Sequence, residues 1–171
     1  MISAFKFRNA GQVCVSPTRI HVQAGIYERF VRLLAEQADR LVQGNGMDSK
    51  TQIGPLANAR RTDAMEAFVA DARSVGARVV AGGERGDASA SGGFFYRPTI
   101  IADVPLEARL MNDEPFGPIA LIRPFDHFDE AIEEANRLPF GLAAYCFTEN
   151  GRRANLVGDA LEAGMVGINS M

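Results

Sequence analysis

The chain has 171 residues, of which 47% are apolar and 23% are charged, and its formal net charge is −3 at pH 7. This balance is typical of one globular domain with a sizeable core, and the interspersed charges give no electrostatic case for binding nucleic acid or an anionic membrane. No stretch approaches the roughly 18 apolar residues of a membrane span, and the first residues lack the pattern of a signal peptide. Two cysteines are too few for a disulfide scaffold and match no metal-binding spacing. We therefore expect a soluble, cytoplasmic protein without a metal.

Hydrophobic periodicity predicts strands that alternate with helices along the chain. In chain order we expect a strand over 15–23, a helix over 26–42, a helix over about 57–75, a strand over 78–81, an extended segment over 96–104, a strand over 119–125, a helix after Asp126, a strand over 142–148, a helix after Asn150 and a strand over 165–169. Gly44 and Gly76 are expected just past two helix ends, while Asp126 and Asn150 are expected to cap helix starts. The stretch 82–93, rich in Gly, Ser and charge, is expected to be a surface loop.

This alternation predicts the α/β fold class, with an open, mostly parallel sheet and helices on its faces. In such sheets functional sites form at the carboxyl ends of the strands. We expect the site of this chain there.

The run Phe7-Arg8-Asn9-Ala10-Gly11-Gln12-Val13-Cys14 places a cysteine in a bend between a helix end and a strand. Such a bend can present a thiol to a cleft, and Arg8 and Arg19 could supply the positive charge that favours the reactive thiolate. On spacing alone, Cys14 is more often a small buried apolar residue than a nucleophile. Cys146, between Tyr145 and Phe147 in a predicted strand, is expected to be such a buried residue.

The segment from Phe7 to Arg19 resembles the active-site strip of the NAD(P)-dependent aldehyde dehydrogenase superfamily. About a hundred residues later, Asn112-Asp113-Glu114-Pro115-Phe116-Gly117-Pro118 resembles the E-x-F-G-P motif of that family. Further similarity extends through 53–56, 93–100, 140–145 and 164–169. The resemblance therefore covers nearly the whole chain.

The resemblance implies that Cys14 is the nucleophile and that NAD or NADP is the cofactor. Cys14 would add to the aldehyde as a thiohemiacetal, which is oxidised to a thioester and then hydrolysed. Glu114 would accept hydrogen bonds from the nicotinamide ribose, and Phe116 would pack against the nicotinamide ring. Without the motif, Glu114 would be read as a solvated acidic residue and Phe116 as a core aromatic.

Arg8 implies a substrate class, because the run Lys6 to Gln12 resembles succinate-semialdehyde dehydrogenases. A guanidinium grips a carboxylate through paired hydrogen bonds, although a surface arginine is the plainer reading. Ser170 falls where the family chain enters its substrate loop and could line the pocket. Some relatives carry a second cysteine two residues after the nucleophile, whereas here Ser16 stands there, so we expect no disulfide switch.

We expect residues 1–171 to form the cysteine-bearing catalytic domain, truncated at both ends, without the cofactor-binding domain, the general base and the oligomerisation segment. On that expectation the chain alone is inactive, and its uncovered apolar surface favours a homo-oligomer or self-association. The alternative is a catalytically silent module that folds or binds a partner. A cysteine hydrolase is disfavoured, because neither His21 nor His127 matches a motif that would pair with Cys14.

Overall fold

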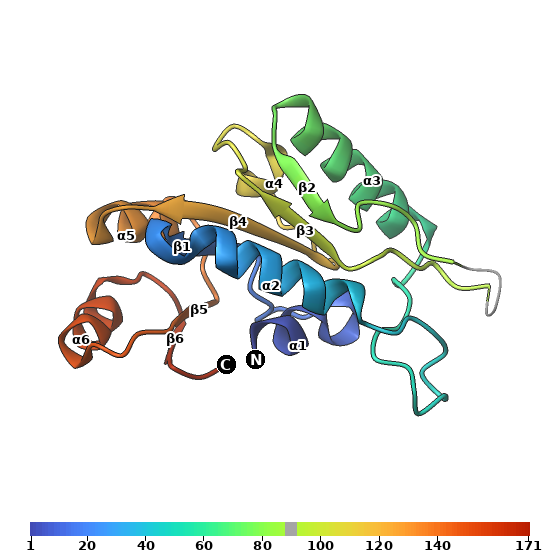
Figure 1. Ribbon diagram of the computed structural model, residues 1–171, viewed down its shortest axis with the longest axis horizontal. Helices are drawn as coiled ribbons and strands as arrows, with labels where there is room; N and C mark the ends of the chain where they lie inside the picture. Colours follow the sequence, from blue (N-terminus) through green and yellow to red (C-terminus); the bar gives the residue numbers. More distant parts are fainter. Residues whose placement is uncertain (88–91) are drawn as a thin grey trace.

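The computed structural model describes residues 1–87 and 92–171 and shows helices packed on a short central sheet (Figure 1). The helices are α1 (Ile2–Phe7), α2 (Tyr27–Asp39), α3 (Ala59–Ser74), α4 (Arg109–Asn112), α5 (Phe128–Asn136) and α6 (Gly151–Ala160), with 3-10 turns at Arg8–Gly11 and Ala24–Ile26. The strands are β1 (Arg19–Gln23), β2 (Arg78–Ala81), β3 (Thr99–Ala102), β4 (Ile119–Phe125), β5 (Ala143–Cys146) and β6 (Met165–Ile168).

Four strands form the main sheet in the order β1-β4-β3-β2. The pairs β1–β4 and β3–β4 are parallel, with Arg19 opposite Leu121 and Thr99 opposite Ile119. β2 runs antiparallel to β3, and the described part of the connection between them contains no crossover helix that would return the chain to a parallel direction. The α/β class with a mostly parallel sheet is thus confirmed.

β5 and β6 form a separate parallel pair, which lies with α6 apart from the main sheet (Figure 1). The predicted strands are therefore divided between two sheets, a division that the sequence analysis did not anticipate. Between β4 and β5 the chain passes through α5 and a loop that contains Pro139 and Gly141.

The core lies between the main sheet and helices α2 and α3. Every residue of β3 is buried, which is typical of a strand covered on both faces. Helix α2 is amphipathic and buries one stripe against the sheet, formed by Tyr27, Val31, Leu34, Ala35 and Ala38. Helix α3 contributes Met65, Phe68, Val69 and Ala72 to the same core. Burial of these side chains provides most of the driving force for the fold.

Local signals located some helix ends correctly and missed others. The Asn150 side chain accepts a hydrogen bond from the Arg153 amide and caps α6, and Gly76 adopts φ 89° just after α3, both as predicted. Helix α2 already ends at Asp39, before Gly44, so that prediction was wrong. Helix α5 starts after His127 without a side-chain cap, so Asp126 does not cap it. Of the predicted loop 82–93, residues 88–91 lie outside the described residues.

Candidate active site

The two motifs meet at the edge of the sheet opposite to the one expected. Cys14 lies in the loop before β1, and Glu114 lies in the loop before β4. Because β1 and β4 are adjacent and parallel, both loops reach the same edge, at the amino ends of these strands. The expectation of a site at the carboxyl ends was therefore wrong for these residues. The alternation of strands and helices does not by itself indicate which loops carry the functional residues.

An unusual left-handed turn precedes Cys14. Asn9, Ala10 and Gly11 have φ values of 50°, 54° and 71°. Asparagine and glycine tolerate this region, whereas alanine does so only at a cost of about 1–2 kcal/mol. Asn9 Nδ2 donates to the Gln12 carbonyl and Gln12 Nε2 donates back to the Asn9 carbonyl, both at 3.1 Å. These reciprocal bonds stabilise the turn, which explains the two amide residues in the motif.

Gln12 also joins the cysteine loop to the segment before α3. Its Oε1 accepts a hydrogen bond from the Ala57 amide at 2.9 Å, and its Nε2 lies 3.4 Å from the Pro55 carbonyl oxygen. The Gly54-Pro55-Leu56 segment therefore supports the turn from outside.

The cysteine loop and the Glu114 loop approach each other at two glycines. A Cβ atom on Gly11 would lie 2.1 Å from the carbonyl oxygen of Gly117. A Cβ on Gly117 would lie 2.3 Å from the sulfur of Met65 in α3. A Cβ at Gly11 would collide with backbone atoms, and a Cβ at Gly117 would displace the Met65 side chain, so the glycines of both motifs have a packing reason.

The loop of Glu114 and Phe116 is held by α3. The Arg61 guanidinium donates to the Pro115 carbonyl and lies 3.4 Å from the Phe116 carbonyl oxygen. Phe116 adopts φ 43°, which is rare for an aromatic residue, and its side chain is 44% exposed. A large apolar ring held out of the core in a strained conformation indicates a contact surface.

Cys14, Glu114 and Phe116 line one small hollow of about 10 Å³, together with Lys6, Gly11, Val13, Ser16 and Thr18. Cys14 is a free, exposed cysteine. Cys14 and Glu114 also line a groove of about 430 Å³ between β1 and the β5–β6 pair, to which both Ile2 and Met171 contribute.

The two residues predicted to bind the substrate, Arg8 and Ser170, line neither hollow. Arg8 is exposed on the turn before Cys14, and its guanidinium carbon lies 4.8 Å from the centroid of the Phe5 ring. Ser170 is exposed just after β6 and lines neither hollow, whereas its neighbour Met171 lines the groove.

Arg19 uses its guanidinium elsewhere and does not supply positive charge to the Cys14 thiol. Its guanidinium donates to the carbonyls of Glu134 and Ala135 and forms an ion pair of 3.3 Å with the Glu134 carboxylate. These contacts tie β1 to α5 rather than supplying charge at Cys14.

Burial is the main cause that lowers the pKa of His21 to about 4, and its Nε2 has no hydrogen-bond partner within 1–87 and 92–171.

The sequence reasoning missed Lys6, Arg61 and Tyr145. Lys6 is only 1% exposed, and burial lowers the pKa of its ammonium group to about 7. Tyr145 donates a hydrogen bond to the Val15 carbonyl, next to Cys14. Lys6 and Tyr145 stand inside the compared motifs, yet their burial and contacts depend on tertiary packing that no local pattern reveals.

The sequence profile described as "Aldehyde dehydrogenase family" matches residues 1–171. This chain belongs to the aldehyde dehydrogenase family. The aldehyde dehydrogenase chain is 46% identical, over 97% of its length, to the 4-(hydroxymethyl)benzenesulfonate dehydrogenase TsaD1 of Comamonas testosteroni, of which it covers 34%. It is 44% identical, over 98% of its length, to the succinate-semialdehyde dehydrogenase (NADP+) of Escherichia coli, of which it also covers 34%.

A solved structure described as an NADP-dependent enzyme of E. coli superposes on this aldehyde dehydrogenase chain with a TM-score of 0.94 at 43% identity. The match covers 99% of this chain and 34% of the other. The chain thus spans about a third of the length of the curated relatives it matches. Within the described ranges, 1–87 and 92–171, no helix is long and apolar enough to cross a bilayer.

Proposed function

We propose that this chain carries the nucleophile and the nicotinamide contacts of an enzyme that oxidises an anionic aldehyde, with succinate semialdehyde as the first candidate, to the acid. The observation that supports the proposal is the meeting of Cys14, Glu114 and Phe116 at one hollow. These residues come from two motifs about a hundred residues apart.

Cys14 performs the covalent step. Its thiolate adds to the aldehyde carbon, because a tetrahedral thiohemiacetal is needed before a hydride can leave. The exposed position of Cys14 admits the aldehyde, and its backbone N–H is a candidate donor to the developing oxyanion. Loss of that hydride to NAD(P)+ and of the hydroxyl proton would leave a thioester, which water hydrolyses to the acid and the free thiol of Cys14.

Glu114 and Phe116 fit a nicotinamide nucleotide. An exposed carboxylate suits the hydroxyls of a ribose, and an exposed ring suits the flat face of a nicotinamide. NAD or NADP, when bound, supplies the hydride acceptor of the oxidation. Arg61 and Met65 hold the loop that presents both side chains.

Arg8 selects the substrate. It is exposed and lies six residues before Cys14 in the chain, and although it lines neither hollow, we expect its guanidinium to reach the far end of a short aldehyde. The names of similar proteins include succinate semialdehyde, which carries a carboxylate at that end, and 4-(hydroxymethyl)benzenesulfonate, an alcohol whose sulfonate lies opposite the reacting carbon. Carboxylates and sulfonates both accept paired N–H donors of arginine. We keep Ser170, which is exposed just after β6, as a proposed secondary polar contact to the substrate.

The test compares two proteins. One is the 171-residue chain, and the other is a full-size form in which this chain replaces the matching segment of the E. coli succinate-semialdehyde dehydrogenase. We expect NAD(P)+-dependent oxidation of succinate semialdehyde by the full-size form only, and we expect Cys14→Ala to abolish it. Cys146→Ala serves as the matched control and should retain activity.

Arg8→Met tests the substrate class in the full-size form. We expect kcat/KM for succinate semialdehyde to fall about 10–100-fold, the value of one charge-assisted contact, while kcat/KM for butanal changes little. An equal loss for both aldehydes would contradict the role of Arg8 in selecting anions. A folded full-size form that oxidises no aldehyde would favour the alternative of a silent module.

A further inference from the structure

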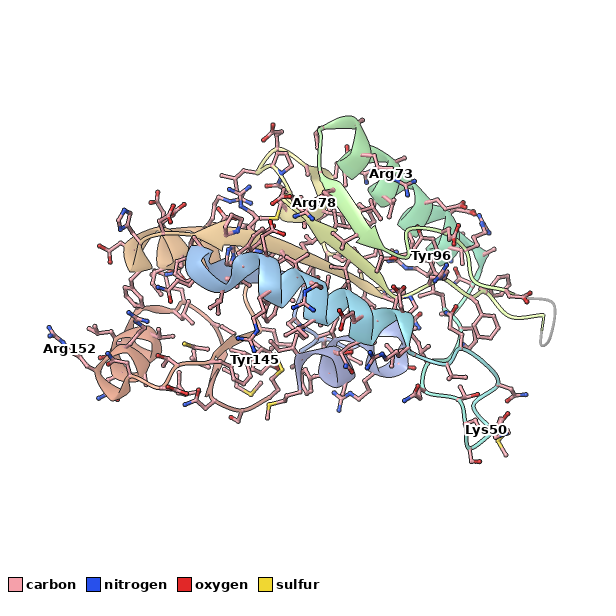
Figure 2. The ribbon with its side chains drawn as sticks, viewed as in Figure 1. Lys50, Arg73, Arg78, Tyr96, Tyr145 and Arg152 are labelled. Atoms are coloured by element: carbon pink, nitrogen blue, oxygen red, sulfur yellow. The ribbon has the colours of Figure 1, made fainter. Side chains whose placement is uncertain are left out.

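Tyr145 on β5 contacts the cysteine loop although it lies 131 residues later in the chain. Its hydroxyl donates a hydrogen bond of 2.9 Å to the carbonyl of Val15, the residue directly after Cys14. In Figure 2, Tyr145 lies between the β5–β6 pair and α1. The hydroxyl therefore links the second sheet to the loop that bears the nucleophile.

The ring of Tyr145 makes a different contact. It packs edge-to-face with Phe5 of α1, with ring centroids 5.5 Å apart and an interplanar angle of 72°. The Arg8 guanidinium lies over the same Phe5 ring, with its carbon 4.8 Å from the centroid. Tyr145, Phe5 and Arg8 thus form one chain of side-chain contacts beside the cysteine loop.

The electrostatics agree with this placement. Burial is the main cause that raises the pKa of the Tyr145 hydroxyl, the Arg8 cation opposes the shift, and a charged Cys14 adds to it. Tyr145 is therefore within electrostatic reach of both the anion-selecting residue and the nucleophile.

We propose that Tyr145 is a positioning residue with two separable parts. Its hydroxyl fixes the loop of Cys14, and its ring, through Phe5, fixes the direction of Arg8. The second part rests on the proposed function, in which Arg8 binds the anionic end of the aldehyde. One residue thereby sets the distance between the attacking sulfur and the group that holds the far end of the substrate.

The two parts separate in three variants of the full-size form, assayed with succinate semialdehyde and with butanal. Tyr145→Phe keeps the ring, so we expect kcat to fall about tenfold for both aldehydes without a change in their kcat/KM ratio. Phe5→Leu removes the ring that contacts both Tyr145 and Arg8. We therefore expect KM for succinate semialdehyde to rise about fivefold and KM for butanal to stay constant. Tyr145→Leu should show both effects.

Tyr96→Phe is the matched control, because it also removes one tyrosine hydroxyl. Figure 2 shows Tyr96 beside α3, and its hydroxyl has no hydrogen-bond partner in the part of the chain that the structure describes. We expect wild-type kinetics from this variant.

Amide hydrogen exchange in the 171-residue chain adds a readout that does not depend on activity. The Ser16 amide donates to the Val13 carbonyl at 3.0 Å and closes the turn around Cys14. We expect faster exchange over residues 13–18 in Tyr145→Phe, and no change there in Tyr96→Phe.

The outcomes distinguish this inference from the proposed function. Unchanged kcat and unchanged exchange in Tyr145→Phe would overturn the role of the hydroxyl. Retained discrimination in Phe5→Leu and Tyr145→Leu, when Arg8→Met loses it, would overturn the role of the ring. If Arg8→Met still discriminates between succinate semialdehyde and butanal, the substrate proposal fails. The role of the Tyr145 hydroxyl is then still tested by kcat and by amide hydrogen exchange in Tyr145→Phe.

Discussion

Lys6 is a cation placed in the interior, at the wall of the hollow that contains Cys14. An ammonium group loses its hydration on burial, which disfavours the charged form. Burial accordingly lowers the pKa of Lys6 to about 7, whereas the unfolded chain has the ordinary value of about 10.4.

This difference predicts a pH-dependent stability. Between about pH 7 and 10 the unfolded chain binds more protons at Lys6 than the folded chain does, so the free energy of unfolding rises with pH. Lys6→Met removes the penalty, and we expect it to stabilise the chain at pH 7 by about 1–3 kcal/mol. Urea unfolding at pH 7, 8 and 9 measures this advantage, which should shrink as the pH rises. An advantage that is constant with pH would contradict the burial of a titrating amine.

Two buried tyrosine side chains differ in whether their hydroxyl has a hydrogen-bond partner. The Tyr27 hydroxyl donates to the Asp103 carboxylate at 2.6 Å and accepts from the Asp103 amide at 2.9 Å. The Tyr96 hydroxyl, by contrast, has no partner among the residues described. We expect Tyr27→Phe to lower the free energy of unfolding by about 1–3 kcal/mol and Tyr96→Phe to leave it unchanged or to raise it. Chemical denaturation of both variants under one condition is the measurement.

Among the elements, the two motif loops depend on each other through the contact of Gly11 with Gly117. A methyl group at Gly11 would both collide with a carbonyl oxygen and occupy a left-handed conformation at φ 71°. The atoms that this methyl group would meet belong to the backbone of Gly117 and Pro118, so they cannot move aside as the end of a flexible side chain could. The cysteine loop and the Glu114 loop therefore form one unit.

Gly11→Ala tests this unit. We expect it to lower the free energy of unfolding by about 2–4 kcal/mol, and to raise KM for NAD(P)+ in the full-size form because the Glu114 loop is displaced. Gly25→Ala is the control, since a Cβ at Gly25 would meet nothing within 4 Å. Similar stabilities of the two variants would contradict the close approach.

The sequence predicted most elements, but only part of their arrangement. The strand over 78–81 and the strand over 119–125 were located to the residue, because each contains a short apolar run, 79–81 or 119–122, with glycine, proline or aspartate close to the ends of the strand. The direction of β2 and the split into two sheets depend on pairings between distant segments, which a local pattern does not encode. Motif resemblance singled out Cys14, Glu114 and Phe116, whereas Tyr145 required the packed structure.

At the scale of the whole molecule, the groove between the main sheet and the β5–β6 pair leaves apolar side chains in solvent. Phe140, Leu142 and Phe147 line it and are 49%, 56% and 44% exposed. Large contiguous apolar surfaces favour association. The expected self-association of the chain therefore has a definite location.

Leu142→Asp tests this location. We expect the 171-residue chain to associate as its concentration rises, and this variant to shift the association to concentrations at least about tenfold higher. Met47→Asp is the control, because Met47 is 93% exposed but does not line the groove. Light scattering over a concentration series is the measurement, and a monomer at every concentration would contradict the prediction.

The strand order also determines when the site can exist during folding. β2, β3 and β4 follow one another closely in the chain, whereas β1 joins the sheet only by pairing with β4, about a hundred residues away. Closing so long a loop costs more entropy than the local pairings do, so β1 is expected to dock late. The cysteine loop immediately precedes β1, and its glycine contact needs the chain before β4 to be in place. We therefore expect the thiol of Cys14 to gain its surroundings in one of the last steps of folding, so that a newly made chain exposes this thiol before the β1–β4 pairing has formed.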